Sequence, residues 1–218
     1  SVYFAVLEFI VNSGRRDLLA RMADRFSKLR RVMFRDGMEW NDHQKLIEVL
    51  KKETEGQQWL TSRGLEAQLL GDFEGVLLDL ALIRACRVLT AQYLMENVDG
   101  PIDPFDETNK TTWKEFAVLD YCDEPGAEEK NFTMQGFCDK FVLAEGAYVT
   151  DVVCNTGLLP RLLGDLRCHT WVLDHGGNPI REEVSNPTGK AGSIHLLFLH
   201  TRSAAARHYE ILCPLDNV

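Results

Sequence analysis

The chain opens on a run that is apolar on nearly every side. Residues 2–11 contain a single charged side chain, Glu8. An apolar run of this length is typical of a helix that is buried on all its faces. Asn12, Ser13 and Gly14 then break the pattern with residues that favour turns. We therefore expect a buried first helix.

A long amphipathic pattern follows this break. Its apolar residues recur at spacings of three and four, which predicts a helix, and basic residues decorate the other face. The apolar positions are Leu18, Leu19, Met22, Phe26, Leu29, Val32 and Met33, and the basic ones are Arg15, Arg16, Arg21, Arg25, Lys28, Arg30 and Arg31. We interpret the basic face as solvated, with a docking surface as the alternative.

The next helix is predicted to follow the Asp36-Gly37 turn. Asn41 or Asp42 can cap it, and its buried face would carry Leu46, Ile47, Val49 and Leu50. Glu39, Asp42 and His43 could form a carboxylate–histidine cluster, but a cap with solvated charges is the better interpretation.

The remaining pattern shifts from helix to strand. An apolar helix over 72–85 is expected to lead into a strand at Arg87–Leu94, with a second strand at Trp113–Cys122 and a short helix at 158–166. Thr170–Leu173 predicts a strand before a tight turn, 181–192 a polar loop, and Ile194–Leu199 another strand. Helices followed by strands predict an α+β fold, in which a helical lobe packs on a mixed or antiparallel β-sheet.

The last predicted strand carries the first candidate chemistry. Side chains at i and i+2 of a strand point to the same face, so His208 and Glu210 stand side by side while Tyr209 faces the other way. A carboxylate beside an imidazole can fix its tautomer and stabilise its protonated form, as a general base requires. Taken alone, a half-buried edge strand with solvated charges is the simpler interpretation.

Composition limits the function classes. A net charge of −9 over 218 residues argues against nucleic acid or an anionic membrane as the main partner and suits a basic peptide or protein surface. No apolar run reaches the length of a membrane span. The six cysteines are scattered without a Cys-x-x-Cys pair, which favours reduced thiols and a cytoplasmic location over disulfides or a zinc site.

Other candidate sites are weaker. Cys168 and His169 are adjacent, so on a strand they point to opposite faces and cannot form a dyad. His195 and His200 also face opposite ways, which argues against a metal pair. The chain lacks a glycine-rich phosphate loop with a downstream lysine. We expect neither a metal nor a cofactor.

The two ends of the chain together suggest a family. Tyr3, Ala5 and Val6 match the positions that follow the nucleophile in the ovarian-tumour (OTU) family of cysteine proteases, most of which are deubiquitinases, and Ser1 falls where the cysteine should be. The family's closing motif is matched by His208, Tyr209, Glu210, Ile211 and Leu212. The chain thus resembles an OTU domain with serine at the catalytic cysteine, although the Asp-Gly-Asn/Asp turn that precedes the cysteine is absent.

This resemblance implies a single papain-like or OTU-like hydrolase domain over residues 1–218, in which 97–170 forms a family-specific insertion or recognition lobe. Ser1 would occupy the nucleophile position, His208 would be the general base, and Glu210 would orient it. The substrate would be ubiquitin or a ubiquitin-like protein. Its Gly-Gly tail would pass the small residues of the loop Thr201–Arg207, with Ala205, Arg207 and Tyr209 as the expected substrate-binding positions.

Serine at position 1 changes the expected activity. An alcohol is much harder to ionise than a thiol, so this form of a thiol protease should be inactive or nearly so. Three interpretations stay open: an engineered Cys-to-Ser change, which we favour, a natural pseudoenzyme that only binds ubiquitin, or an accidental match. An N-terminal-nucleophile hydrolase is a further rival, but such enzymes begin on a strand. The location would be the cytoplasm, or the host cytoplasm for a chain from a virus or intracellular bacterium.

Overall fold

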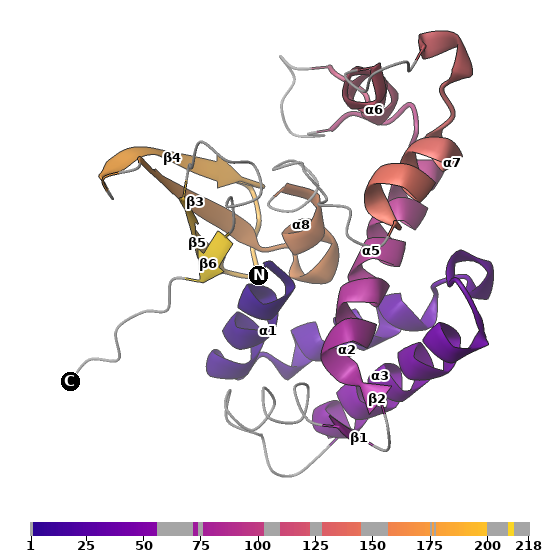
Figure 1. The fold of residues 1–218 in the computed structure, drawn as a ribbon. Helices are drawn as coiled ribbons and strands as arrows, with labels where there is room; N and C mark the ends of the chain where they lie inside the picture. Colours follow the sequence, from indigo (N-terminus) through magenta and orange to yellow (C-terminus); the bar gives the residue numbers. More distant parts are fainter. Residues whose placement is uncertain are drawn as a thin grey trace.

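A computed structural model describes residues 2–55, 72–73, 76–102, 110–122, 128–144, 157–174, 176, 178–199 and 209–211. Helices make up the first part of the chain and a small sheet the last part (Figure 1). The predicted α+β class is thus confirmed, and of the two sheet types that the sequence left open, mixed or antiparallel, the sheet is mixed. No helix within these described ranges is long and apolar enough to cross a membrane.

The first two predicted helices are both present. α1 spans Val2–Asn12 and α2 spans Arg16–Ser27, and Gly14 between them adopts a φ of +64°, which lets the chain reverse. Ile10 is fully buried in α1, as are Leu18 and Leu19 in α2. Both predicted helices are therefore confirmed, and together they supply much of the core of the helical lobe.

The second helix ends earlier than the pattern predicts. After α2 the chain turns into a short 3-10 helix, η1 (Arg31–Met33). Leu29 is still buried, but Val32 is 88 % exposed and Met33 only half-buried. Extending the helix to Val32 and Met33 was wrong, because the change of direction after Ser27 takes the last two apolar residues off the buried face.

The third helix, α3, spans Gly37–Glu55 and starts a turn earlier than predicted. Its first turn is capped by Asp36, whose Oδ1 accepts the backbone N–H groups of Met38 and Glu39 at 2.9 Å each. The Glu39 carboxylate in turn accepts the N–H of Arg35 at 2.8 Å. The predicted caps Asn41 and Asp42 lie inside the helix, because Asp36 already accepts the free backbone N–H groups of its first turn.

Two predicted strands are helical. A two-stranded hairpin of β1 (Asp72–Phe73) and β2 (Val76–Leu77) leads into α5 (Leu78–Glu96), which runs straight through the expected strand at Arg87–Leu94. Residues Val88, Leu89, Ala91 and Leu94 continue the buried stripe of that helix. Packing of this stripe against α3 outweighs the preference of β-branched residues such as Val88 for a strand.

The strand predicted at Trp113–Cys122 is α6, with the same bounds. Thr112 and Glu115 form a reciprocal cap: the Thr112 N–H donates to the Glu115 carboxylate at 2.7 Å, and the Glu115 N–H donates to Oγ1 of Thr112 at 3.2 Å. Trp113 and Ala117 are buried at a helical spacing of four. The Thr-x-x-Glu sequence was the available signal for a helix.

Short helices connect α6 to the sheet. They are η2 (Glu129–Asn131), α7 (Met134–Phe137), the π-helical η3 (Cys138–Val142) and α8 (Leu159–Gly164). α8 confirms the short helix predicted at 158–166. α6 and α7 lie at one end of the long α5 helix, away from the sheet (Figure 1).

The sheet has the strand order β4-β3-β5-β6. Its strands are β3 (Arg167–Leu173), β4 (Pro179–Ser185), β5 (Ser193–Leu199) and β6 (Tyr209–Ile211). β3 pairs antiparallel with β4 and parallel with β5, and β5 pairs antiparallel with β6. The predicted strands before the 174–180 turn and at 194–199 are confirmed, and so is the pairing of the last two strands.

The polar loop predicted at 181–192 is partly a strand. β4 carries Arg181, Glu182 and Glu183, and most of its side chains are exposed. Charged residues suit a strand at the edge of a sheet, where they discourage pairing with other chains. The alternation of buried and exposed residues that reveals an inner strand is therefore missing here.

A crossing loop returns the chain from β4 to the start of β5, on the far side of β3. The Asn186 amide donates to the Leu166 carbonyl at 2.9 Å, and Arg167 donates from Nε to the Gly189 carbonyl at 2.9 Å. These bonds hold the loop beneath the start of β3. Gly192 ends it with a φ of +145°, against the ring of Phe9 from α1.

Candidate functional site

Most residues of the candidate site predicted from the sequence lie just outside the described part of the chain. Ser1, His208, Ala205 and Arg207 fall outside the described residues. Tyr209 and Glu210 are described through their backbone, as the first two residues of β6. What the structure contributes is the arrangement of the elements that begin next to Ser1 and His208.

Those two elements, α1 and β6, are in contact. α1 packs against β5 and β6, and its beginning lies beside β6 in Figure 1. The far half of the helix lies at the other end of β5, because Phe9 packs at Gly192, directly before that strand. An eleven-residue helix is about 16 Å long, so its direction decides which end approaches β6.

The first turn of α1 also faces α5. The half-buried Tyr3 has a pKa raised by burial and, to a smaller extent, by neighbouring Cys86, while Arg87 acts in the opposite direction. Cys86 is fully buried, and burial strongly raises the pKa of its thiol. A thiol held protonated in this way is a poor nucleophile, so Cys86 cannot supply the function of a cysteine at position 1.

The sheet carries a histidine cluster that sequence reasoning missed. The Nδ1 atom of His169 in β3 lies 2.7 Å from a carboxylate oxygen of Glu182 in β4. The imidazole of His195 in β5 stacks on that of His169, with ring centroids 4.7 Å apart and planes 18° from parallel. These residues come from three strands, so only the register reveals the cluster.

The cluster favours neutral His195. Burial lowers the pKa of His195, and the neighbouring His169 lowers it further, while Glu182 acts in the opposite direction. Within the described ranges no three His, Cys, Asp or Glu side chains are arranged to hold a metal ion. Ser193 lies on the same face, two residues before His195 in β5, but no hydrogen bond between its hydroxyl and either imidazole is seen among the described residues.

Strand register relates this cluster to Glu210. Glu182 pairs with Trp171, Trp171 with Leu197, and Leu197 with Glu210. Position 210 therefore belongs to the same row across the sheet as Glu182, one row along from the His169–His195 pair. The other side of the sheet carries the buried residues Cys168, Thr170, Val172, Ile194 and Leu196.

The structure tests two predictions about individual histidines, His169 and His43. Cys168 is buried, with a pKa that burial raises to about 12, whereas His169 is half-buried on the opposite face, so the two form no dyad, as predicted. The interpretation of His43 as part of a solvated cap was wrong. His43 is 1 % exposed and its Nε2 lies 2.9 Å from the Phe26 carbonyl oxygen, because the ring completes the apolar face of α3.

The fold and this geometry define a class: an α+β protein whose first helix packs against the last strand of a mixed sheet. No protein-family profile matches the sequence, and a comparison with curated proteins finds no match.

Proposed function

We propose that this chain is an OTU-like cysteine protease domain, a deubiquitinase that cleaves the peptide or isopeptide bond after the C-terminal glycine of ubiquitin or a ubiquitin-like protein. The observation that carries the proposal is the contact between α1 and β6. The two OTU-like motifs begin directly before these elements, at Ser1 and His208. A fold in which the two elements pack together supports pairing those residues across a papain-like site.

The roles follow from position. A nucleophile before the first turn of α1 would feel the positive end of the helix dipole, which lowers the pKa of a thiol. His208 would deprotonate it and Glu210 would orient the imidazole. Support comes from the motifs and the α1–β6 contact. The predicted strand at Arg87–Leu94 adds no support, because that stretch is helical and belongs to α5.

Serine at position 1 favours a second candidate, a non-catalytic ubiquitin-binding module of the same fold. A serine keeps the size of the cysteine and removes the ionisable thiol, so binding would persist without turnover. The cytoplasm remains the proposed location. It is supported by the free thiols among the described cysteines, which are Cys86, Cys122, Cys138 and Cys168.

The test is Ser1→Cys in a chain preceded by Asp-Gly-Asn, treated with ubiquitin that carries an electrophile in place of its C-terminal carboxylate. The proposal expects a single covalent adduct of chain and ubiquitin, which is abolished by His208→Ala. A folded Ser1→Cys chain that forms no adduct contradicts the protease. If that chain still binds ubiquitin, the second candidate holds.

A matched control separates catalysis from general thiol reactivity. Ser13→Cys introduces an exposed thiol at the other end of α1, and Cys122 is an exposed thiol already present. The parent chain and Ser13→Cys should both stay unmodified by the probe. Equal labelling of Ser13→Cys and Ser1→Cys would show that the probe reports exposure alone.

A further inference from the structure

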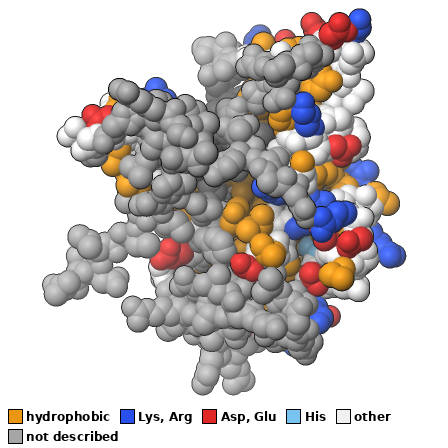
Figure 2. Space-filling model, in the orientation of Figure 1, with side chains coloured by type: hydrophobic (Ala, Val, Ile, Leu, Met, Phe, Trp, Pro, Cys, Tyr) orange, Lys and Arg blue, Asp and Glu red, His pale blue; other side chains and the backbone are white. Residues whose placement is uncertain are grey.

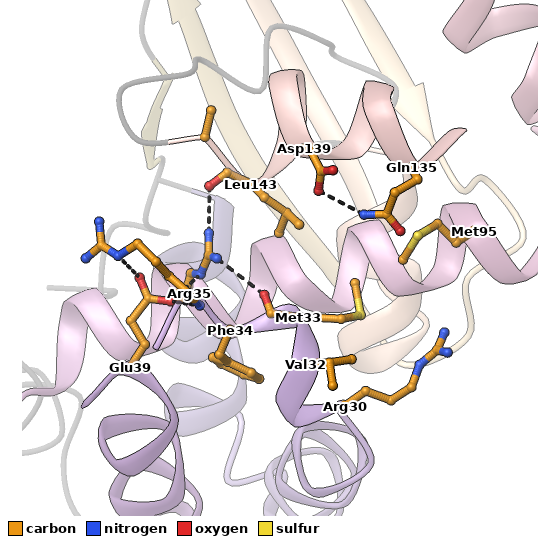
Figure 3. Close-up of a pocket in the computed structure, with 12 residues that line it drawn as sticks. Arg30, Val32, Met33, Phe34, Arg35, Glu39, Met95, Gln135, Asp139 and Leu143 are labelled. Atoms are coloured by element: carbon orange, nitrogen blue, oxygen red, sulfur yellow. Dashed lines mark hydrogen bonds and ion pairs between the residues drawn. The ribbon is translucent and has the colours of Figure 1, made fainter. Parts of the chain in front are cut away.

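Large apolar side chains are exposed on the helical lobe and on β4. On the helical lobe they lie among charges of both signs (Figure 2). Val32, for example, is 88 % exposed beside a hollow in which Arg35 pairs with Glu39 at 3.5 Å (Figure 3). Such mixed charges favour no particular partner. On β4, where Ile180 is 56 % exposed and Val184 is 44 % exposed, the charges follow a regular pattern.

β4 lies at the edge of the sheet. It pairs antiparallel with β3 on one side, and no strand of the described ranges pairs with its other side (Figure 1). The side chains of residues 179–182 and 184 are exposed. A strand in this position presents free backbone N–H and C=O groups, which can pair with a further strand. The side chains of β4 then decide which strand can be added.

The sequence of β4 is complementary to itself in the antiparallel direction. In an antiparallel pair, opposite residues lie on the same face, where their side chains contact each other. When two copies of β4 pair about a two-fold axis at Glu182, Arg181 of each copy lies opposite Glu183 of the other. The exposed Ile180 likewise lies opposite the exposed Val184. The pairing thus supplies both ion pairs and apolar pairs.

Neighbouring registers of β4 with itself lack this property. Opposite residues must both direct their backbone groups toward the partner, so the axis passes through a residue. An axis at Arg181 would place this arginine opposite itself and Ile180 opposite Glu182. An axis at Glu183 would place this glutamate opposite itself and Val184 opposite Glu182. Only the axis at Glu182 therefore combines both kinds of favourable pair.

Contacts within one chain suit this arrangement. The two copies of Glu182 would lie opposite each other, but a carboxylate oxygen of Glu182 lies 2.7 Å from Nδ1 of His169 and is thus directed toward its own sheet. Arg181 and Glu183 already pair at 2.7 Å, with side chains 64 % and 33 % exposed. Two opposite copies would join these pairs into one charge network, which is stronger than an isolated surface pair. Ile180 has no opposite residue on β3, so a second copy would supply its cross-strand neighbour.

We propose that β4 is the interface of a symmetric homodimer, in which two copies of the strand pair antiparallel about Glu182 and join their sheets into one. Charges along an edge strand discourage pairing with strands of other sequence, whereas those of β4 favour a second copy of the same chain. The interface is small, so we expect a dissociation constant on the order of 100 µM. β6 lies at the other edge of the sheet, so the inference is independent of the protease proposal.

Sedimentation velocity of the full chain, from about 5 µM to about 1 mM, measures the association. The parent chain should pass from monomer to dimer over this range. Arg181→Glu opposes glutamates across the axis and Glu183→Arg opposes arginines. Each variant alone should dimerise at least about tenfold more weakly, because like charges directly opposite repel. A parent chain that is monomeric at about 1 mM, or single variants that dimerise as the parent does, would overturn the proposal.

Mixing the two variants separates pairing between chains from pairing within a chain. In a mixed dimer each substituted side chain lies opposite the unlike charge of the other variant, although neither chain regains an ion pair of its own. The equimolar mixture should therefore dimerise about as tightly as the parent chain. A mixture that stays as monomeric as its components would overturn the register.

Lys28→Glu is a matched control on α2. Like Arg181→Glu, it reverses one charge of an exposed ion pair, here the pair of Lys28 with Asp24 at 2.6 Å. The variant should dimerise within about twofold of the parent chain. Equal weakening by Lys28→Glu would show that net charge, and not β4, controls the association, which would overturn the assignment of this interface.

Disulfide formation locates the axis. Glu182→Cys places a thiol opposite its own copy, with Cα atoms about 5 Å apart, within the range of a disulfide. Val184→Cys is the control, because its copy lies about 13 Å further along the ladder. Under mild oxidation, only Glu182→Cys should give a covalent dimer above the background of the parent chain on a non-reducing gel. Equal cross-linking of Val184→Cys would contradict an axis at Glu182 and overturn the proposed dimer.

Discussion

His43 shows at the residue scale how a histidine can be structural. Its Nε2–H donates to the Phe26 carbonyl, and its Nδ1 has no hydrogen-bond partner among the described residues. Phe34 and Trp40 pack around the ring with centroids 4.6 and 5.5 Å away. Burial lowers the pKa of His43, with the bond to Phe26 acting in the opposite direction.

This environment predicts a pH-dependent loss of stability. As pH falls below about 6.5, the unfolded chain gains a proton that folded His43 resists, so the free energy of unfolding falls by at most about 1.4 kcal/mol per pH unit. Urea unfolding at pH 7.5 and 5.5 measures this loss. His43→Phe should reduce it but not abolish it, because the pKa of His195 is also lowered. An unchanged pH dependence in His43→Phe would refute this assignment.

Gly192 gives a second prediction at the same scale. A Cβ atom there would lie 2.2 Å from Cζ of Phe9, and the φ of +145° is one that side chains rarely adopt. Gly192→Ala should therefore destabilise the fold by about 2–4 kcal/mol. Gly14→Ala is the matched control, since φ is +64° and no atom lies within 4 Å, so it should cost only about 1–2 kcal/mol. Equal costs in thermal or urea unfolding would show that the Phe9 contact is unimportant.

Elements are joined by arginines of α5. Arg84 reaches η1, α3 and the end of η3, and Arg87 donates to the Ala144 carbonyl at 2.7 Å. Cations that bind the last carbonyls of a helix are a common way of satisfying its free acceptors. The order of α7 and η3 therefore depends on α5 as much as on their own four- and five-residue sequences.

Removing Arg84 should cost more than removing an ordinary surface charge. Arg84→Ala removes a donor from two carbonyls and from the mostly buried Glu39, which then keeps only its bonds to Arg35 among the described residues, and we expect a loss of about 2–3 kcal/mol. Lys28→Ala removes an exposed pair with Asp24 on α2 and should cost less than about 0.5 kcal/mol. Urea unfolding of the two variants compares them directly. Similar midpoints would mean that the three bonds of Arg84 contribute little.

Secondary structure was predictable where periodicity matched burial. α1, α2, β3 and β5 follow their patterns, because the buried side chains alone decide those elements. The later part of α5 and the whole of α6 were predicted as strands. Val88 and Leu89 suit a strand as well as a helix, and only their packing in the core decides for α5. Phe116 and Val118 are equally ambiguous, and the Thr112 cap decides for α6. The histidine cluster depends on pairing between strands, so no local pattern could reveal His169 beside Glu182 and His195.

At the scale of the whole molecule, the first and the last described elements pack together. The first helix and the last strand are separated by nearly the full sequence, yet α1 packs against β6. The meeting of Ser1 and His208 stays a prediction, because both residues lie outside the described ones. The crossing loop beneath β3 was not predictable from the sequence. The contact between α1 and β6 is the basis of the proposed thiol-protease site.

The most direct test of that site is the pKa of a thiol at position 1. Iodoacetamide labelling rates of Ser1→Cys are measured against pH, with and without His208→Ala. A thiolate–imidazolium pair predicts rapid labelling well below pH 7, which His208→Ala moves toward the ordinary cysteine pKa of about 8.5. An ordinary profile in Ser1→Cys, unchanged by His208→Ala, would contradict a catalytic pairing of the two positions.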